Sequence, residues 1–162
     1  MSILAPPIIA LADERHLEAL MSVMRASFDA QFGEAWSTLQ LAGTISLANS
    51  FARQAISSHG VIAGFTLCRA AGPEVELLLI AVDPAERGKG VGRLLIENAC
   101  RDAFLRGASE VFLEVRENNH AARALYRNAG FIDVGFRADY YAGTTGARFG
   151  AVTMRRGLDD LI

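Results

Sequence analysis

The N-terminal part of the chain has hydrophobic patterns of two helices after a short strand. Residues 8–11 are an apolar segment of strand length, and Asp13 is a candidate N-cap for the helix that follows. A second helix is expected to begin after Ser37, its N-cap, and to run toward Leu47. The first helix has apolar residues at helical spacing, namely Leu17, Leu20, Met21, Met24 and Phe28.

The middle of the chain is predicted to be β-structure. Residues 52–57 and 61–69 have strand-like composition, and the turn-forming sequence between them, 58–60, predicts a hairpin. A further strand is expected over 74–82. It ends at Asp83-Pro84, because proline lacks the backbone N–H that a strand ladder needs and disfavours helix in the residue before it.

The C-terminal half alternates between helices and strands. A helix is predicted over 91–105, and Gly107 suits its C-terminal cap. The remaining elements are a strand over 110–116, a helix over 119–129 capped by Asn119, and a pair of strands over 131–139 and 147–155. The resulting order, β-α-α-β-β-β-α-β-α-β-β, predicts a mixed α/β domain with a parallel crossover around the two late helices.

Composition limits the class of protein. The 162 residues lack low-complexity linkers and repeats, so we expect a single domain over 1–162. The net charge of -2 gives no electrostatic reason to expect nucleic acid or a membrane surface as a partner. There is no signal peptide pattern and no apolar run of membrane-spanning length, and Cys68 and Cys100 lie in separate apolar segments. A cytoplasmic protein with two buried thiols is therefore expected.

The loop over 87–92 is the strongest candidate for ligand chemistry. Gly88, Gly90 and Gly92 let the backbone approach a ligand closely, and the loop opens a helix whose first N–H groups and dipole favour an anion. Nearby cations would reinforce a phosphate site, and they are Arg87, Lys89 and Arg93. From these residues alone, the alternative is a glycine-rich solvated turn with ordinary surface cations.

The glycine spacing excludes two common phosphate loops. No Ser or Thr follows Lys89, as a P-loop requires, and glycines at 88, 90 and 92 do not form Gly-x-Gly-x-x-Gly. The loop instead resembles the Arg/Gln-x-x-Gly-x-Gly/Ala signature of the GNAT acetyltransferase superfamily, through Arg87, Gly90 and Gly92. The likeness extends over residues 77–136 and is greatest to the ribosomal-protein-alanine N-acetyltransferase branch.

The resemblance implies a fold, a donor and a set of site residues. The implied fold is the GNAT acyl-CoA N-acyltransferase fold, with a mixed, mostly antiparallel sheet splayed where the coenzyme enters. The implied donor is acetyl-CoA, without a metal, and the implied base and acid are Glu114 and Tyr126. The donor-binding residues would be Ile80, Ala81, Val82, Arg87, Gly88, Lys89, Gly90, Val91, Gly92, Arg93, Asn119 and Tyr126.

The residues themselves leave these roles open. Glu114 lies between Leu113 and Val115 in a strand, where a half-exposed structural glutamate is the alternative to a base. A helical tyrosine such as Tyr126 is commonly a packing residue. Glu114 and Tyr126 are twelve residues apart, which is the interval between base and acid in the family, and this spacing favours catalytic roles for both. His16, His59 and His120 are isolated and have no metal-site spacing.

The acceptor side departs from the branch. An acidic pair is usual before the Ala-x-x-Met stretch of the last strand, but Phe149-Gly150 stands there, and Ala142 replaces a proline. Candidate acceptor residues, which are alternatively ordinary strand residues, are Glu74, Glu76, Tyr140 and Tyr141. A protein N-terminal α-amine is the favoured acceptor. The alternatives are a small amine (an amino acid, polyamine or aminoglycoside), or a non-catalytic acyl-CoA-binding module.

Overall fold

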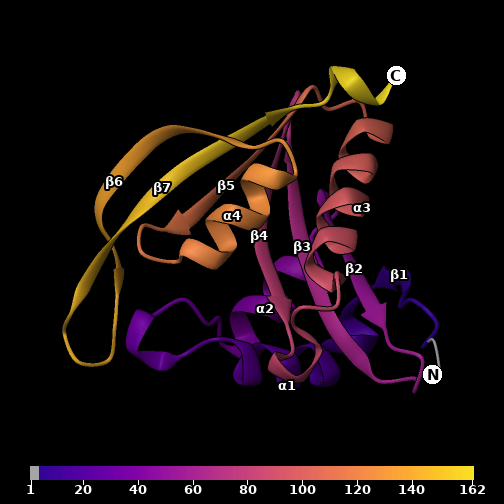
Figure 1. Cartoon of the computed structure of the whole chain (residues 1–162), viewed down its shortest axis with the longest axis horizontal. Helices are drawn as coiled ribbons and strands as arrows, with labels where there is room; N and C mark the ends of the chain where they lie inside the picture. The colour runs from indigo at the N-terminus through magenta and orange to yellow at the C-terminus, as the bar shows by residue number, and fades with distance from the viewer. Residues whose placement is uncertain (1–3) are drawn as a thin grey trace.

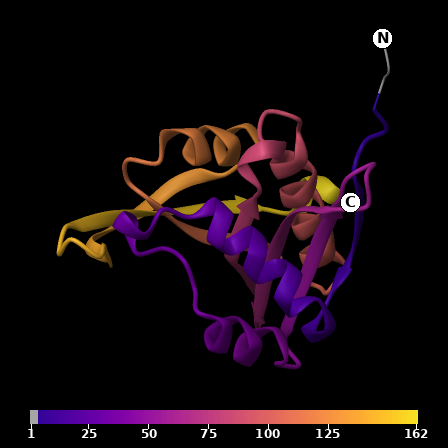
Figure 2. The same ribbon diagram turned by 90° about the horizontal axis from the view of Figure 1, so that it is seen from below.

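A computed structural model describes residues 4–162, which form a twisted seven-stranded sheet with helices on both faces (Figures 1 and 2). The order across the sheet is β1-β2-β3-β4-β5-β7-β6. The strands are β1 (Ile8–Ala12), β2 (Ser50–Ile56), β3 (Ile62–Ala71), β4 (Glu74–Val82), β5 (Glu110–Arg116), β6 (Ile132–Ala142) and β7 (Arg148–Gly157). The helices are α1 (Leu17–Ser27), α2 (Thr38–Ile45), α3 (Val91–Leu105) and α4 (His120–Asn128). The predicted order of elements is confirmed.

Helix ends follow the capping chemistry of the sequence. Ser37 caps α2 in a reciprocal capping box with Gln40, and Asn119 accepts a hydrogen bond from the backbone N–H of Ala122 at the start of α4. Asp13 caps a short 3₁₀ turn that leads into α1. That helix ends at Ser27. Phe28, which was expected to continue the helix, instead has extended backbone. After Ser27 the chain therefore continues as an extended segment into the loop between α1 and α2.

The sheet separates the core into two layers, and a pair of helices covers each layer. Helices α1 and α2 cover one face of the sheet, and α3 and α4 cover the other, as the view from below shows (Figure 2). Cys68 and Cys100 are both buried in the α3–α4 layer, where burial raises the pKa of each thiol. Two buried, protonated thiols act as small apolar side chains, as expected.

Within residues 4–162, six pairs of neighbouring strands build the sheet, and of these pairs only β4 and β5 run parallel. Helix α3 makes the crossover between them. Helix α4 joins β5 to β6, but β7 lies between these two strands. The parallel ladder extends only from Glu74↔Glu110 to Leu77↔Leu113. Beyond this point β4 and β5 separate, so the predicted splay of the sheet is confirmed.

A β-bulge at Leu78 precedes the separation. Leu67 is opposite Leu79 and Cys68 is opposite Leu77, which leaves Leu78 without a partner on β3. The bulge exchanges the two faces of β4. Leu77 packs into the α3–α4 layer, whereas Leu79 packs into the α1–α2 layer, although both are buried and two residues apart. The same strand thereby contributes to both cores.

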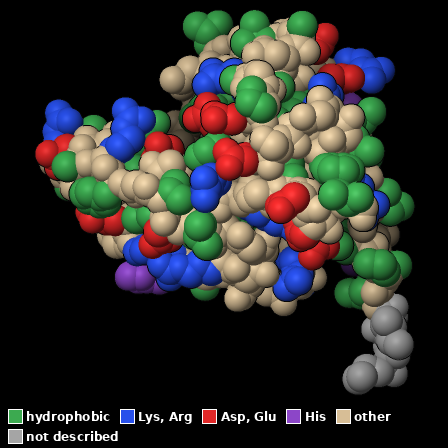
Figure 3. Space-filling model, turned by 90° about the horizontal axis from the view of Figure 1, so that it is seen from above, with side chains coloured by type: hydrophobic (Ala, Val, Ile, Leu, Met, Phe, Trp, Pro, Cys, Tyr) green, Lys and Arg blue, Asp and Glu red, His purple; other side chains and the backbone are tan. Residues whose placement is uncertain are grey.

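The surface carries charges of both signs. Acidic and basic side chains are interspersed on the face seen from above (Figure 3). Within residues 4–162, no helix is long and apolar enough to span a membrane. In the same residues, no group of three or more His, Cys, Asp or Glu side chains is placed to hold a metal ion.

The separated strands depend on the packing of β5 against the α3–α4 layer. Leu113 is the last residue of the parallel ladder, and only 2% of it is exposed. Leu113→Ala is expected to lower the free energy of unfolding by about 2–5 kcal/mol, because it removes buried methyl groups and leaves a cavity. Urea unfolding followed by circular dichroism measures this change.

Leu105→Ala provides the matched control. The same side chain is removed from the end of α3, where Leu105 is 73% exposed. We expect a change within about 0.5 kcal/mol. Equal losses of stability in the two variants would contradict the central position of Leu113 in the core.

Candidate active site

A cleft of about 690 Å³ opens where β4 and β5 separate. Its floor is formed by the diverging ends of the two strands. One end is bordered by the start of α3 and by α4, and the other by the loop between α1 and α2 and by the end of β6. The cleft brings together most of the predicted site residues, namely Glu76, Ile80, Ala81, Val82, Arg87, Gly88, Gly90, Val91, Gly92, Arg93, Glu114, Asn119, Tyr126, Tyr140 and Tyr141.

Backbone geometry prepares the start of α3 for an anion. Gly88 and Gly90 have φ angles of 76° and 81°, in the left-handed region that glycine adopts most readily. Gly90 is the N-cap, and no side chain caps the helix. The first N–H groups of α3 therefore remain available, and the helix dipole adds positive potential at this point. The loop therefore presents free N–H groups to the cleft, and its binding of a phosphate stays a prediction.

The three cations of the loop have different surroundings. The guanidinium of Arg87 donates to the carbonyl oxygens of Ser27, at 2.9 Å, and Val82, at 3.3 Å. It therefore connects the end of α1 to the end of β4 as well as adding charge. Arg93 lines the cleft and pairs with Glu97 on the next turn of α3. Lys89 lies outside the lining of the cleft in the described chain, with its Nζ 3.2 Å from Glu86.

The end of β4 offers a free strand edge to the cleft. Ile80, Ala81 and Val82 pair with β3 on one side, but past Leu77 they have no β5 residue on the other. Alternate backbone groups on this edge therefore face the cleft. An extended ligand can pair with them as an added strand does.

Glu114 projects from β5 into the cleft. Its side chain is 19% exposed, and its Oε2 accepts a hydrogen bond of 3.0 Å from the Thr153 hydroxyl. Arg137 Nη1 lies 3.8 Å from Oε1. The neighbours of Glu114 on the strand, Leu113 and Val115, point into the core on the opposite face, as predicted. The carboxylate is therefore held in one orientation at the cleft surface.

Tyr126 reaches the same cleft from α4. The residue is 6% exposed and packs edge-on against Phe131, with ring centroids 6.0 Å apart. Burial raises the pKa of its hydroxyl, and the negative charge of Glu34 raises it further. The phenol therefore stays protonated throughout the neutral range. A protonated hydroxyl at the cleft wall is suited to donate a proton or a hydrogen bond.

The predicted acceptor residues are only partly brought together. Tyr140 and Tyr141 form an edge-to-face pair at 4.9 Å, and the Tyr141 hydroxyl donates to the backbone carbonyl of Glu114 at 3.3 Å. Glu76 lines the cleft but pairs with Arg69 at 2.8 Å. Glu74 is exposed at the start of β4 and is not part of the described cleft lining.

Phe149 and Gly150, which replace the acidic pair, have packing roles. The Phe149 ring contacts the ring of Phe32 edge-on, with centroids 5.3 Å apart. A Cβ on Gly150 would lie 2.4 Å from the Phe136 ring, so only glycine lets this ring cross β7 there. The end of the β6–β7 hairpin is thus attached to the α1–α2 loop by apolar contact.

Sequence reasoning missed an ion pair at the acceptor end. Glu34, in the α1–α2 loop, pairs with Arg116 at the end of β5 at 3.1 Å, and both residues line the cleft. The Arg116 guanidinium also stacks on Phe32, 3.5 Å from the ring centroid. Trp36, two residues after Glu34, also lines the cleft, and an isolated tryptophan in a loop was the nearest signal available in the sequence.

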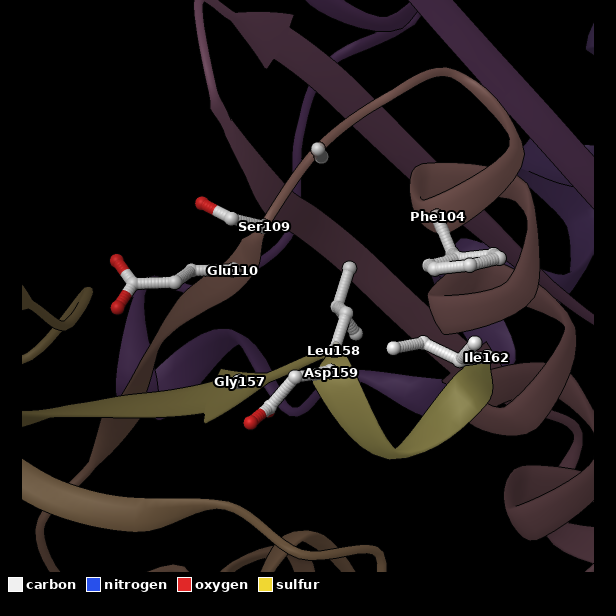
Figure 4. Close-up of a pocket in the computed structure, with 8 residues that line it drawn as sticks. Phe104, Ser109, Glu110, Gly157, Leu158, Asp159 and Ile162 are labelled. Carbon is white, nitrogen blue, oxygen red and sulfur yellow. The ribbon is translucent and has the colours of Figure 1, made fainter.

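A separate recess of about 470 Å³ lies at the other end of α3 (Figure 4). Phe104, Leu158 and Ile162 surround it, while the carboxylates of Glu110 and Asp159 point away from these apolar side chains (Figure 4). None of the predicted site residues lines it. The cleft between β4 and β5 is therefore the candidate active site.

Comparison with known sequences identifies relatives of this chain. It is 37% identical over 99 residues to the [ribosomal protein bS18]-alanine N-acetyltransferase of Escherichia coli K12, which is 61% of this chain and 66% of that enzyme. It is 48% identical over 87 residues to the N-alpha-acetyltransferase RimI of Mycobacterium tuberculosis. That match covers 54% of this chain and 51% of the relative, so the aligned part is about half to two thirds of each relative.

Solved structures and a family model agree with these matches. The crystal structure of the ribosomal-protein-S18-alanine N-acetyltransferase from Escherichia coli superposes with a TM-score of 0.83 at 29% identity, covering 94% of both chains. A putative phosphinothricin N-acetyltransferase shares the fold, with a TM-score of 0.80 at 22% identity. Residues 17–131 match the model of the acetyltransferase (GNAT) family. The chain belongs to the GNAT family of acetyltransferases.

Proposed function

We propose that this protein transfers the acetyl group of acetyl-CoA to a protein N-terminal α-amine of the ribosomal-protein-alanine type. The reaction proceeds by direct attack of the amine in a ternary complex. The observation that carries the proposal is that Glu114 and Tyr126 face one cleft, with the phosphate loop at one end and aromatic and acidic side chains at the other. The relatives named as alanine or α-amine acetyltransferases support this choice of acceptor.

The donor half of the cleft fits acetyl-CoA. The free N–H groups at the start of α3 suit the pyrophosphate, with Arg93 close by and Arg87 holding the loop against α1 and β4. The open edge of β4 suits the amide groups of the pantetheine arm. A backbone N–H at Val82 would polarise the thioester carbonyl. Asn119 lines the same half of the cleft while it caps α4.

Glu114 and Tyr126 divide the proton transfers between them. Glu114 takes a proton from the acceptor ammonium, and the free amine then attacks the carbonyl carbon of the thioester. The carbon–sulfur bond breaks as the tetrahedral intermediate collapses, and Tyr126 protonates the departing thiolate. The pKa of Tyr126 is raised by burial, which keeps this proton in place until the thiolate forms. The attacking nitrogen, which is positively charged after the attack, gives up its second proton as the amide forms, and the Tyr126 phenolate accepts that proton.

Two other functions remain as rivals. A small amine would fit the same donor chemistry, since the donor half of the cleft does not depend on the acceptor. A non-catalytic module would bind acetyl-CoA and leave Glu114 and Tyr126 unused. The identity of the acceptor distinguishes the small-amine enzyme from the proposal, and the absence of any turnover distinguishes the binding module.

The first prediction concerns the acceptor. With purified protein and acetyl-CoA, peptides that begin with alanine are expected to release coenzyme A faster than peptides with larger first residues, and faster than free amino acids, polyamines or aminoglycosides. A thiol-release assay measures the rates. Turnover confined to small amines would contradict the proposed acceptor. Coenzyme binding without turnover on any amine would identify a binding module.

The second prediction concerns Glu114. Glu114→Gln keeps an oxygen for the Thr153 hydroxyl but removes the base, so kcat is expected to fall roughly 10²–10⁴-fold. The loss is expected to shrink above about pH 8, because the α-amine, with a pKa near 8, then loses its proton without help. A pH profile of both enzymes measures this recovery. A loss independent of pH would argue against a role in deprotonation.

The third prediction separates two cations of the loop. Arg87→Ala removes two hydrogen bonds to backbone carbonyls and is expected to weaken acetyl-CoA binding on the order of 10-fold. Lys89→Ala is the matched control, because Lys89 is not part of the described cleft lining and its charge is paired with Glu86, which does line the cleft. Its effect is expected to be small and to disappear at high salt. Calorimetric titration with acetyl-CoA measures both, and an equal loss in the two variants would contradict this distinction.

A further inference from the structure

Glu34 occupies a special position at the acceptor end of the cleft. Its side chain is 14% exposed, and its Oε1 accepts a hydrogen bond from Arg116 Nε. The residue also lines the cleft, as Glu114 does, but it reaches the cleft from the α1–α2 loop instead of the sheet. A carboxylate has about four lone-pair sites, and one guanidinium N–H leaves most of them available.

The loop that carries Glu34 is fixed by close backbone contact. A Cβ on Gly33 would lie 1.9 Å from the carbonyl oxygen of Ala142, and a Cβ on Gly143 would lie 1.7 Å from that of Gln31. These two glycines let the α1–α2 loop and the β6–β7 hairpin touch along their backbones. Because Gly33 directly precedes Glu34, the carboxylate is held in place before any acceptor arrives.

The charge of Glu34 acts on the residues around the acceptor. It raises the pKa of both Tyr126 and Tyr141, after the larger effect of burial. Glu34 is therefore close to the proposed acid, Tyr126, and to Tyr141. At the two positions on β7 where the related branch has acidic residues, this chain has Phe149 and Gly150. The α1–α2 loop nevertheless places a part-buried carboxylate, that of Glu34, at this end of the cleft.

We propose that Glu34 binds the ammonium group of the acceptor, held in position by Arg116 and by the joined α1–α2 and β6–β7 loops. This inference rests on the proposed function and adds a second carboxylate to it. Glu34 orients the ammonium, and Glu114 removes its proton. The surroundings of the two carboxylates differ. Glu114 accepts a hydrogen bond from the Thr153 hydroxyl and has only the exposed Arg137 guanidinium nearby, at 3.8 Å, whereas Glu34 pairs with the buried Arg116 at 3.1 Å.

An equilibrium binding experiment tests this role without relying on turnover. The protein loaded with coenzyme A is titrated with a peptide that begins with alanine. It is also titrated with the same peptide beginning with a propionyl group, which has hydrogen in place of the ammonium. Wild-type protein is expected to bind the ammonium peptide more tightly. In Glu34→Gln, binding of that peptide is expected to weaken on the order of 10-fold, while binding of the propionyl peptide stays unchanged.

The control variants distinguish this role from a structural one. Glu34→Gln keeps an oxygen for Arg116, and Glu34→Asp keeps the charge and is expected to restore part of the preference for the ammonium peptide. Asp102→Asn removes the charge of another part-buried ion pair, with Arg53 at 2.7 Å, far along α3 from the loop, and is expected to affect neither peptide. Thermal unfolding confirms that each variant is folded.

Three results would overturn the proposal. Wild-type protein could show no preference for the ammonium peptide, Glu34→Gln could leave that preference intact, or it could weaken both peptides equally. A failure of acetyl transfer to peptides would instead count against the proposed function, since the binding comparison does not require turnover.

Discussion

The early end of the parallel ladder between β4 and β5 is the constraint on which the site depends. The ladder stops at Leu77↔Leu113, and the two strands then diverge because each is held by other neighbours, β4 by β3 and β5 by β7. Backbone groups that would have paired across the sheet are left facing a cleft. Such groups need partners when they are covered, so the divergence creates both the space for an extended ligand and the hydrogen-bonding edge that holds it.

The bulge at Leu78 makes this divergence compatible with a well-packed core. Before the bulge β4 packs its buried side chains against the α3–α4 layer, and after it against the α1–α2 layer. The end of β4 is thus drawn toward α1, and Arg87 fastens it there by bonding to Ser27 and Val82. A cation that a sequence motif suggests for phosphate binding therefore also positions the strand edge. Charge and backbone geometry contribute to the same site through one side chain.

Local chemistry predicted most of the fold, whereas long-range contacts were beyond its reach. The order of elements, the bounds of α3 and the caps at Ser37 and Asn119 follow from periodicity and capping residues within a few positions. The face exchange in β4 does not, because Leu77 and Leu79 continue the same alternation in the sequence. The pair between Glu34 and Arg116 joins residues 82 positions apart, so no local pattern indicates it. The loop at the start of α3 was therefore predictable from local sequence, whereas the pair at the other end of the cleft required the tertiary structure. The donor role of that loop stays a prediction.

The acceptor end also shows how aromatic packing positions a pair of buried and part-buried charges. Phenylalanine and glycine at 149 and 150 convert that part of β7 into a packing surface, on which Phe32 and Phe136 rest. The Arg116 guanidinium in turn stacks on the Phe32 ring and pairs with Glu34. A buried guanidinium is costly unless it is paired, so Arg116 requires a carboxylate at this point. The α1–α2 loop supplies this carboxylate through Glu34, so the aromatic packing around Arg116 also determines where Glu34 lies in the cleft.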